Sequence, residues 1–247
     1  MNVCATPLLP PGIHNIRDLG GLPRQAGGHT APRRVLRACA MQHIRDQDRA
    51  ALVDAGLSTV IDLRSDAEIA AVPAAFAGHP AVTTLRHPVF SDLAPIASMI
   101  AAEPEFRLEL RYVRALELAA PRFAAVIAAV ADAAPGMVVV HCTAGKDRTG
   151  IVAAMLLDLA GVPRPAIVAD YARTVDYGAG LLAELRRRAL AAGQPANSVD
   201  KTLGAPPEAM AATLSMLDQA HGGTAGYLRQ AGLSEETLIR AAARLAA

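Results

Sequence analysis

The sequence predicts a layered α/β fold in which strands alternate with helices and a helical C-terminal part follows. Short β-branched runs are separated by segments with helical spacing of apolar residues as far as Gly161. From Pro165 to Ala247 the spacing stays helical, with breaks near 178–180, 193–207 and 222–223. Such an order of elements is typical of helices packed on a sheet, with a helical extension.

The composition indicates one large domain, spanning residues 1–247, with ample material for a core. Hydrophobic residues make up 52% of the chain but aromatic residues only 3%, so the core must consist mainly of Ala, Val, Leu and Ile. The net charge of +1 argues against nucleic acid as a partner. We expect the basic run Arg186–Arg188 to lie on a solvated helix face. The sequence does not indicate an oligomeric state.

The three cysteines form no Cys-x-x-Cys pair, and their odd number favours a reducing compartment. No signal peptide is visible, so we expect a cytoplasmic protein, with secretion by another route left open. The most apolar stretch, 123–140, is interrupted by Asp132, Pro135 and Gly136. It is too short and too interrupted to span a bilayer, so we expect no integral membrane segment.

The N-terminal elements are set by turn residues and β-branched runs. We expect an extended lead-in over the first eleven residues, then a polar and glycine-rich turn over Asn15–Gly21. Val35–Ala38 is typical of a strand. A helix should follow, with Asp46 as its N-cap and Gly56 just beyond its end.

Two further strands are expected over Ser58–Leu63 and Ala81–Val89. The region Pro95–Ala134 has helical spacing, with breaks expected at Pro104 and Pro121. A short β-branched strand, Met137–Val140, then precedes a helix that should end at Gly161.

The most informative segment joins this last strand to its helix and reads His-Cys-Thr-Ala-Gly-Lys-Asp-Arg-Thr-Gly from His141 to Gly150. A loop in this position lies at a helix N-terminus, where unpaired N–H groups and the positive end of the helix dipole attract an anion. Cys142 and Arg148 are separated by five residues within it. This arrangement favours a thiolate at Cys142 and a phosphate clamp at Arg148.

The residue types of the loop suit phosphoryl transfer. Cys142 would attack phosphorus, and water would then hydrolyse the resulting cysteinyl-phosphate. Gly145 permits the tight backbone geometry, and Thr149 is placed to donate a hydrogen bond to the departing sulfur. His141 is expected to orient the loop through hydrogen bonds to backbone. The phosphate-binding residues would be Thr143, Ala144, Gly145, Lys146, Asp147 and Arg148.

A second Cys-x5-Arg sequence runs from Cys39 to Arg45. It has no glycine in its loop, and no strongly apolar helix follows it. We interpret this second copy as accidental, which shows that the spacing alone is a weak signal.

An acid is needed to protonate the leaving alcohol or phenolate. The chain has no tryptophan, so a Trp-Pro-Asp acid loop is ruled out. Asp147 lies inside the loop, Asp92 follows a predicted strand, and Asp176 lies beyond the loop helix. We favour Asp147, then Asp92.

Other uses of the loop fit less well. A nucleotide-binding Walker loop requires glycine where Val140 stands and Ser or Thr where Asp147 stands. The seven histidines show no metal-ligand spacing, so neither a metal nor another cofactor is expected.

The loop motif resembles that of the bacterial tyrosine/serine protein phosphatases, cysteine-dependent enzymes whose loop reads His-Cys-x-Ala-Gly-Lys-Asp-Arg-Thr-Gly. Asn15–Gly21, Val60–Ser65, Asp170-Tyr171 and Gly226–Gly232 are similar to other segments of that family. The resemblance implies a cysteine-phosphatase-like fold with a mixed central sheet. It also implies that Cys142 is the nucleophile, with Arg148 binding phosphate and Lys146 and Asp147 acting on substrate.

The resemblance further implies supporting roles for Asp18 and Arg64 and a candidate acid role for Asp92. It implies activity on phosphotyrosine, with phosphoserine, phosphothreonine or phosphoinositides as further substrates. The family usually has Arg-Ser-Ser where this chain has Arg37-Ala38-Cys39. Residues 93–120 are the candidate for a helical lid. Because that stretch is short, the sequence does not decide whether a lid is present.

Three hypotheses follow. A metal-independent phosphomonoester hydrolase accounts best for the loop residues. A phosphate-binding module that has lost catalysis is the alternative, because the acid is not assigned. A rhodanese-type sulfurtransferase also places a cysteine in an α/β anion loop, but Arg148-Thr149 argue against it.

Overall fold

The computed structural model of the chain describes residues 13–91, 93, 96–102 and 106–246. The expected N-terminal lead-in, Cys4 and the candidate acid Asp92 lie outside the described residues. Assignment of the whole chain to one domain stays a prediction.

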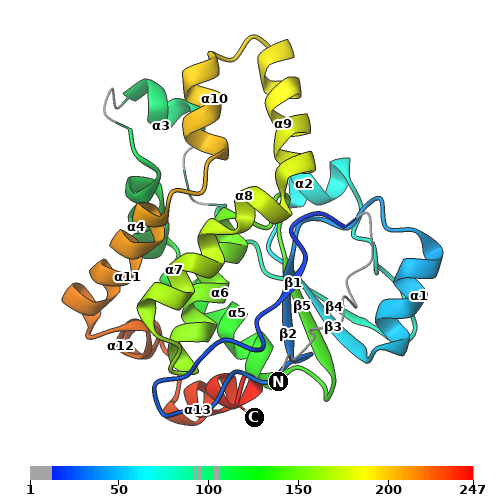
Figure 1. Ribbon diagram of the computed structural model, residues 1–247, viewed down its shortest axis with the longest axis vertical. Helices are drawn as coiled ribbons and strands as arrows, with labels where there is room; N and C mark the ends of the chain where they lie inside the picture. Colours follow the sequence, from blue (N-terminus) through cyan, green and yellow to red (C-terminus); the bar gives the residue numbers. More distant parts are fainter. Residues whose placement is uncertain (1–12, 92, 94–95, 103–105, 247) are drawn as a thin grey trace.

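The core of the fold is a five-stranded sheet with strand order β1-β2-β5-β3-β4 (Figure 1). β1 runs antiparallel to β2, and the remaining neighbours are parallel. The sheet is therefore mixed, as predicted. The strands are Arg17–Asp18 (β1), Val35–Ala38 (β2), Leu57–Asp62 (β3), Thr83–Arg86 (β4) and Met137–His141 (β5).

Helices make up most of the rest of the described chain. Between the strands lie Asp46–Asp54 (α1), Asp66–Ala71 (α2), Ile96–Ala102 (α3), Leu108–Leu118 (α4) and Ala120–Asp132 (α5). After β5 come only helices: Asp147–Leu159 (α6), Arg164–Ala172 (α7), Thr174–Tyr177 (α8), Ala179–Ala191 (α9), Ala196–Leu203 (α10), Pro207–His221 (α11), Thr224–Gln230 (α12) and Glu235–Arg244 (α13). The predicted helical C-terminal part is confirmed for the described residues.

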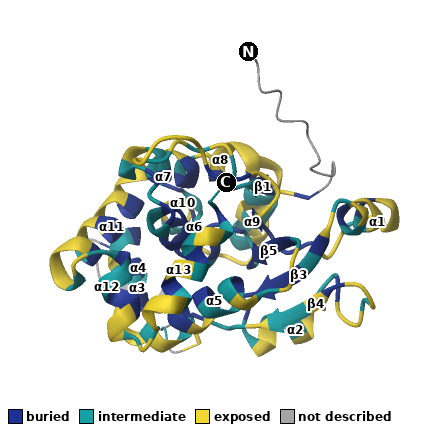
Figure 2. Ribbon diagram, turned by 90° about the horizontal axis from the view of Figure 1, so that it is seen from below, coloured by how far each residue is buried: buried dark blue, intermediate teal, exposed yellow. Residues whose placement is uncertain are grey.

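The central strand β5 is buried on both faces of the sheet. Successive side chains of a strand point to opposite faces, so Val138 and Val140 join the larger apolar cluster, whereas Val139 joins the smaller one. The larger cluster packs under α4, α5, α6, α7, α11 and α13, and the smaller one under α1. Figure 2 shows α5, α6 and α13 on one side of the buried strands and α1 on the other.

The parallel strands β2, β5 and β3 end together, and this edge positions residues 142–148, the predicted phosphate-binding loop (called the phosphate loop below). In the strand register, Ala38 and Asp62 both lie opposite His141, the last residue of β5. The chain beyond His141 therefore emerges between the ends of two neighbouring strands. Ligand sites of parallel sheets lie at this carboxyl edge.

Several boundaries differ from the predicted ones. Helix α2 was not predicted, although Ser65 and Glu68 form a capping box at its start. The break expected at Pro121 is present, since α4 ends at Leu118 and Pro121 lies in the first turn of α5, where the N–H that proline lacks would be unbonded. The break expected at Pro104 lies outside the described residues. Helix α10 lies within the expected break at 193–207, and Arg17–Asp18 form an edge strand where a turn was expected.

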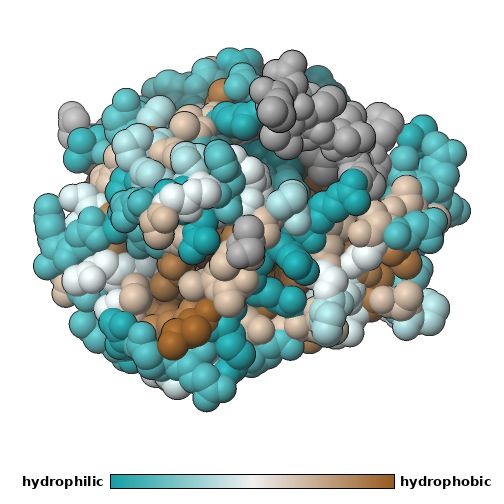
Figure 3. Space-filling model, turned by 60° about the horizontal axis from the view of Figure 1, so that its bottom comes forward, coloured by the Kyte–Doolittle hydropathy of each residue, from teal (hydrophilic) through white to brown (hydrophobic). Residues whose placement is uncertain are grey.

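The surface carries mixed charge. Arg186, Arg187 and Arg188 are exposed and pair with acidic residues of α9 and α10, as expected of a solvated face. Figure 3 shows a face dominated by hydrophilic side chains, with apolar groups confined to small patches. Among the helices of the described chain, none combines the length and apolarity that crossing a membrane requires.

Candidate active site

The phosphate loop connects β5 to α6 and forms the floor of a pocket of about 460 Å³. Cys142 follows β5 directly and is 2% exposed, while Asp147 and Arg148 begin α6. The pocket is lined by Ser65, Glu68, Phe90, Ser91, Ile96, Arg111, Cys142, Thr143, Ala144, Lys146, Asp147, Arg148, Thr202 and Leu203. The structure thus brings the sulfur, the guanidinium and the helix N-terminus to one cavity.

Gly145 allows the loop to turn against the end of β2. Its φ of +66° lies in the left-handed region, which residues with a Cβ rarely adopt. A Cβ at this position would lie 2.4 Å from the carbonyl oxygen of Ala38. Both the conformation and the close approach therefore require glycine.

The loop carbonyls are bonded from behind by buried side chains. The Asn15 amide donates to the carbonyl oxygens of Ala144 and Gly145, both at 2.9 Å, and Arg37 donates to Gly145 at 2.8 Å. In a trans peptide the carbonyl and the following N–H point in opposite directions. Holding these carbonyls therefore turns the N–H groups of Gly145 and Lys146 to the other side of the loop.

Asp170 of α7 neutralises the arginines behind the loop. Its carboxylate accepts from Arg17 and from Arg37, each at 2.7 Å, and all three side chains are buried. Burial alone would raise the pKa of Asp170, but Arg37 and Arg17 outweigh it and hold the pKa below its ordinary value. Burial and the neighbouring Arg37 lower the pKa of Arg17 to about 10.

Arg148 is held at the other side of the pocket by Glu68. Two guanidinium nitrogens donate to the two carboxylate oxygens at 2.6 and 2.7 Å, and the Thr143 hydroxyl donates to the same carboxylate. Burial alone would lower the pKa of Arg148, but the hydrogen bonds to Glu68 outweigh burial and keep the pKa above its usual range. The same contacts outweigh burial at Glu68 and hold its pKa well below its usual range.

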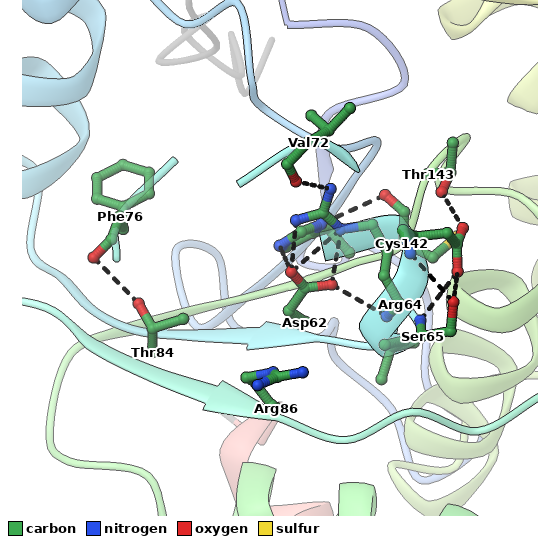
Figure 4. Close-up of polar contacts among 12 residues, drawn as sticks. Asp62, Arg64, Ser65, Val72, Phe76, Thr84, Arg86, Cys142 and Thr143 are labelled. Carbon is green, nitrogen blue, oxygen red and sulfur yellow. Dashed lines mark hydrogen bonds and ion pairs between the residues drawn. The ribbon is translucent and has the colours of Figure 1, made fainter. Parts of the chain in front are cut away.

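The turn between β3 and α2 places Glu68. The Ser65 N–H donates to the Glu68 carboxylate at 2.9 Å. Arg64 pairs with Asp62 at 2.7 Å and donates to the carbonyl of Val72 at 2.9 Å, which ties both ends of α2 together. Figure 4 shows Arg64 between Asp62 and Val72, with Thr143 and Cys142 beside the turn. We therefore propose that Arg64 supports the site indirectly, by holding α2 and with it Glu68 in place.

Lys146 lines the pocket, but its ammonium group is engaged by the protein. Nζ donates to the carbonyl oxygens of Thr202 and Gly204 at 2.7 and 2.8 Å and pairs with Asp147 at 2.9 Å. A lysine bonded to the last carbonyls of a helix stabilises that end. Lys146 therefore ties the phosphate loop to the end of α10.

Asp147, the favoured acid, lines the pocket, and its side chain is 27% exposed. It accepts a hydrogen bond of 2.6 Å from the Tyr112 hydroxyl. Burial alone would raise the pKa of Asp147, but Lys146 and Tyr112 outweigh it and lower the pKa below its ordinary value. These two neighbours therefore favour the carboxylate of Asp147 over its acid form.

Thr149 and His141 flank the loop. The Thr149 hydroxyl is buried and makes no hydrogen bond to any described residue, so it is available to a ligand or sulfur atom. The ring of His141 contacts the carbonyl of Cys142 at 3.3 Å and lies 3.7 Å from Asp62. Burial lowers the pKa of His141 despite this carboxylate.

Other predicted residues lie away from the pocket lining. Asp18 accepts from the N–H groups of Gly20 and Arg33 and shapes the turn after β1. Asp176 is exposed in α8. In the second Cys-x5-Arg sequence, Cys39 is buried, which raises the pKa of its thiol to about 12, and Arg45 pairs with Asp48 instead.

The region 93–120 contributes α3 and α4. Ile96, the first residue of α3, lines the pocket, and α3 contacts α10, which also contributes lining residues (Figure 1). In α4, Tyr112, Ala115 and Leu116 are buried in the main core. Motion of these helices as a lid stays a prediction.

Several polar residues of the site had no assigned role from the sequence, among them Arg37, Glu68, Tyr112 and Asp170. The capping pattern Ser65-x-x-Glu68 was a usable signal for Glu68. Arg37 lies within a predicted strand, and Asp170 belongs to a segment similar to the phosphatase family. No local pattern distinguishes Tyr112.

A family model described as "Tyrosine phosphatase family" matches residues 9–247. The chain belongs to the tyrosine phosphatase family. This match confirms the resemblance drawn from the loop and makes the chain a protein-tyrosine-phosphatase by family. A tyrosine-protein phosphatase of Nostoc commune is 34% identical, over 85% of this chain and 73% of that protein. The triple specificity protein phosphatase PtpB of Mycobacterium tuberculosis is 28% identical, over 93% and 95% of the two chains.

Among solved structures, TpbA of P. aeruginosa is 20% identical, with a TM-score of 0.34 over 59% of this chain and 79% of that one. TpbA with a cysteine-to-serine substitution, in complex with pTyr, is 19% identical, with the same TM-score over 68% and 85% of the two chains.

Substitution of Gly145 by alanine should lower the free energy of unfolding by more than the cost of placing a Cβ in the left-handed region, because the Cβ would also clash with Ala38. A residue with a Cβ in this region costs about 1–2 kcal/mol, and the clash with Ala38 adds roughly 1–3 kcal/mol. Gly161→Ala is the matched control, because Gly161 has a φ of +77° and open space at its Cβ position. Urea unfolding should show a larger loss of unfolding free energy for Gly145→Ala than for Gly161→Ala. Equal losses would contradict the close approach of Gly145 to the Ala38 carbonyl.

Proposed function

We propose that this chain hydrolyses phosphomonoesters, phosphotyrosine above all, through a cysteinyl-phosphate intermediate on Cys142. One observation supports this most: Cys142 and Arg148 line the same pocket at the N-terminus of α6. The family membership of the chain supports the same activity. The relative PtpB is named as a triple specificity phosphatase, so phosphoserine, phosphothreonine or phosphoinositides are proposed as further substrates.

In the proposed first step, Sγ of Cys142 attacks phosphorus in line and the bond to the leaving oxygen breaks. The loop N–H groups and the Arg148 guanidinium would bind the three equatorial oxygens, where negative charge is spread. Glu68 holds the guanidinium plane of Arg148 in one orientation, which reduces the conformational entropy that the side chain loses when it binds phosphate. In the second step, water attacks phosphorus and the sulfur leaves, stabilised by the Thr149 hydroxyl.

The apolar lining of the pocket suits an aromatic leaving group. Phe90, Ile96 and Leu203 line the pocket together with Arg111. A phenyl ring attached to a phosphate on the loop would contact these apolar side chains, whereas a serine side chain is shorter. This lining supports a preference for phosphotyrosine.

Two aspartates remain proposed acids for the leaving oxygen. Lys146 and Tyr112 lower the pKa of Asp147, but a bound phosphate dianion would raise it by repulsion. Asp92 follows Ser91, which lines the pocket.

Replacing the nucleophile tests the mechanism. Cys142→Ser should abolish turnover of para-nitrophenyl phosphate, because a serine hydroxyl is not ionised at neutral pH. Vanadate or phosphate should still bind, since the loop amides and Arg148 remain. Binding is measured by calorimetry and turnover by absorbance. Undiminished turnover would reject the mechanism, and wild-type protein that binds phosphate without turnover would indicate a phosphate-binding module.

The acid is identified by leaving-group dependence. We compare Asp147→Asn and Asp92→Asn on aryl phosphates of rising phenol pKa, and on phosphopeptides and phosphoinositides. Loss of the acid should lower kcat by about 10²–10⁴-fold on poor leaving groups and far less on para-nitrophenyl phosphate. A uniform loss across all leaving groups would show that the substituted residue is not the acid.

A further inference from the structure

Two tyrosines lie behind Asp147 and form a chain of hydrogen bonds. The hydroxyl of Tyr112, in α4, donates to Asp147 at 2.6 Å and lies 2.7 Å from the hydroxyl of Tyr171, in α7. A hydroxyl has one proton to donate. Because Tyr112 uses its proton toward Asp147, Tyr171 must donate to Tyr112.

Both tyrosines are fixed by their surroundings. Tyr112 is 0% exposed and Tyr171 1%, and their rings pack edge to face with centroids 6.1 Å apart. The Tyr171 ring also lies against Gly150 in the first turn of α6, where a Cβ would be 3.0 Å from the ring. The hydroxyl chain is therefore rigid relative to the start of α6.

Two consecutive residues of α7, Asp170 and Tyr171, are connected to different parts of the phosphate loop through hydrogen bonds. Asp170 holds Arg17 and Arg37, and Arg37 bonds the carbonyl of Gly145. Tyr171, the next residue, reaches Asp147 through Tyr112. The position of α7 thus determines both the backbone of the loop and the carboxylate at its end.

We propose that Tyr112 is a positioning residue for the phosphatase reaction: its hydroxyl, held by Tyr171, fixes the Asp147 carboxylate beside Lys146 at the start of α6. This inference rests on the proposed function, because it gives Asp147 a place in that reaction. It holds whether Asp147 acts as the acid or as the anionic partner of Lys146.

The charge of Asp147 depends on the groups that face it. These are Lys146 and Arg148 from the loop, Arg111 and Tyr112 from α4, and Tyr171 from α7. The three cations and the Tyr112 hydroxyl favour the ionised form. Removing the hydroxyl leaves the cations, so the pKa of Asp147 should rise by about one unit, the value of one hydrogen bond to a charged group.

The test measures kcat/KM for phenyl phosphate, whose poor leaving group needs the acid, against pH in wild type, Tyr112→Phe, Asp147→Asn and Tyr227→Phe. Tyr227 is the matched control, because its buried hydroxyl bonds the carbonyl of Leu116 and none of the loop residues. The substrate's own ionisation is common to all four. The limb of the profile that Asp147→Asn removes should move to higher pH by about one unit in Tyr112→Phe and stay in place in Tyr227→Phe.

Tyr171→Phe provides a second variant in case Tyr112→Phe fails to fold. It should move the same limb in the same direction by a smaller amount, because Tyr112 still donates to Asp147. The inference is overturned if the limb does not move, if Tyr227→Phe moves it equally, or if Asp147→Asn removes no limb. Absence of wild-type turnover would instead reject the proposed function.

Discussion

The phosphate loop depends on hydrogen bonds to its carbonyl groups from behind. A loop that turns successive N–H groups toward one point brings like dipoles together, which is unfavourable until an anion arrives. Asn15 and Arg37 offset this cost by bonding the carbonyls of Ala144 and Gly145 on the opposite side. Arg37 can be buried there only because Asp170 neutralises it, so a residue far along the chain supports the loop.

The same principle applies to the guanidinium of the pocket. Both terminal nitrogens of the Arg148 guanidinium donate to the carboxylate of Glu68, which lies in a short helix shortly after β3. Glu68 also accepts from Thr143, so the carboxylate connects the first and last parts of the loop. Donors held in place before the substrate arrives need no reorganisation when charge develops, and this preorganisation is a main source of rate enhancement. α2 thus contributes to the site without contributing a nucleophile or an acid.

Much of this arrangement could be predicted from the sequence. The run His141–Gly150 between a β-branched strand and an apolar helix indicated the loop. Its glycine indicated tight backbone geometry, and Gly145 indeed adopts a left-handed conformation. Glu68, Asp170 and Tyr112 come from α2, α7 and α4, and their approach to the loop depends on packing between distant segments. Spacing along the chain carries no information on such contacts. The ammonium of Lys146 shows the same limit, because its bonds to Thr202 and Gly204 depend on where α10 lies.

The central claim is that Cys142 becomes covalently phosphorylated during turnover. Rapid mixing of the protein with an aryl phosphate, followed by a denaturing quench and peptide mass spectrometry, tests it most directly. The account predicts a phosphate adduct on the peptide that contains Cys142, formed within one turnover and lost as the substrate is consumed. Sustained turnover with Cys142 unmodified, or an adduct on another residue, would contradict it.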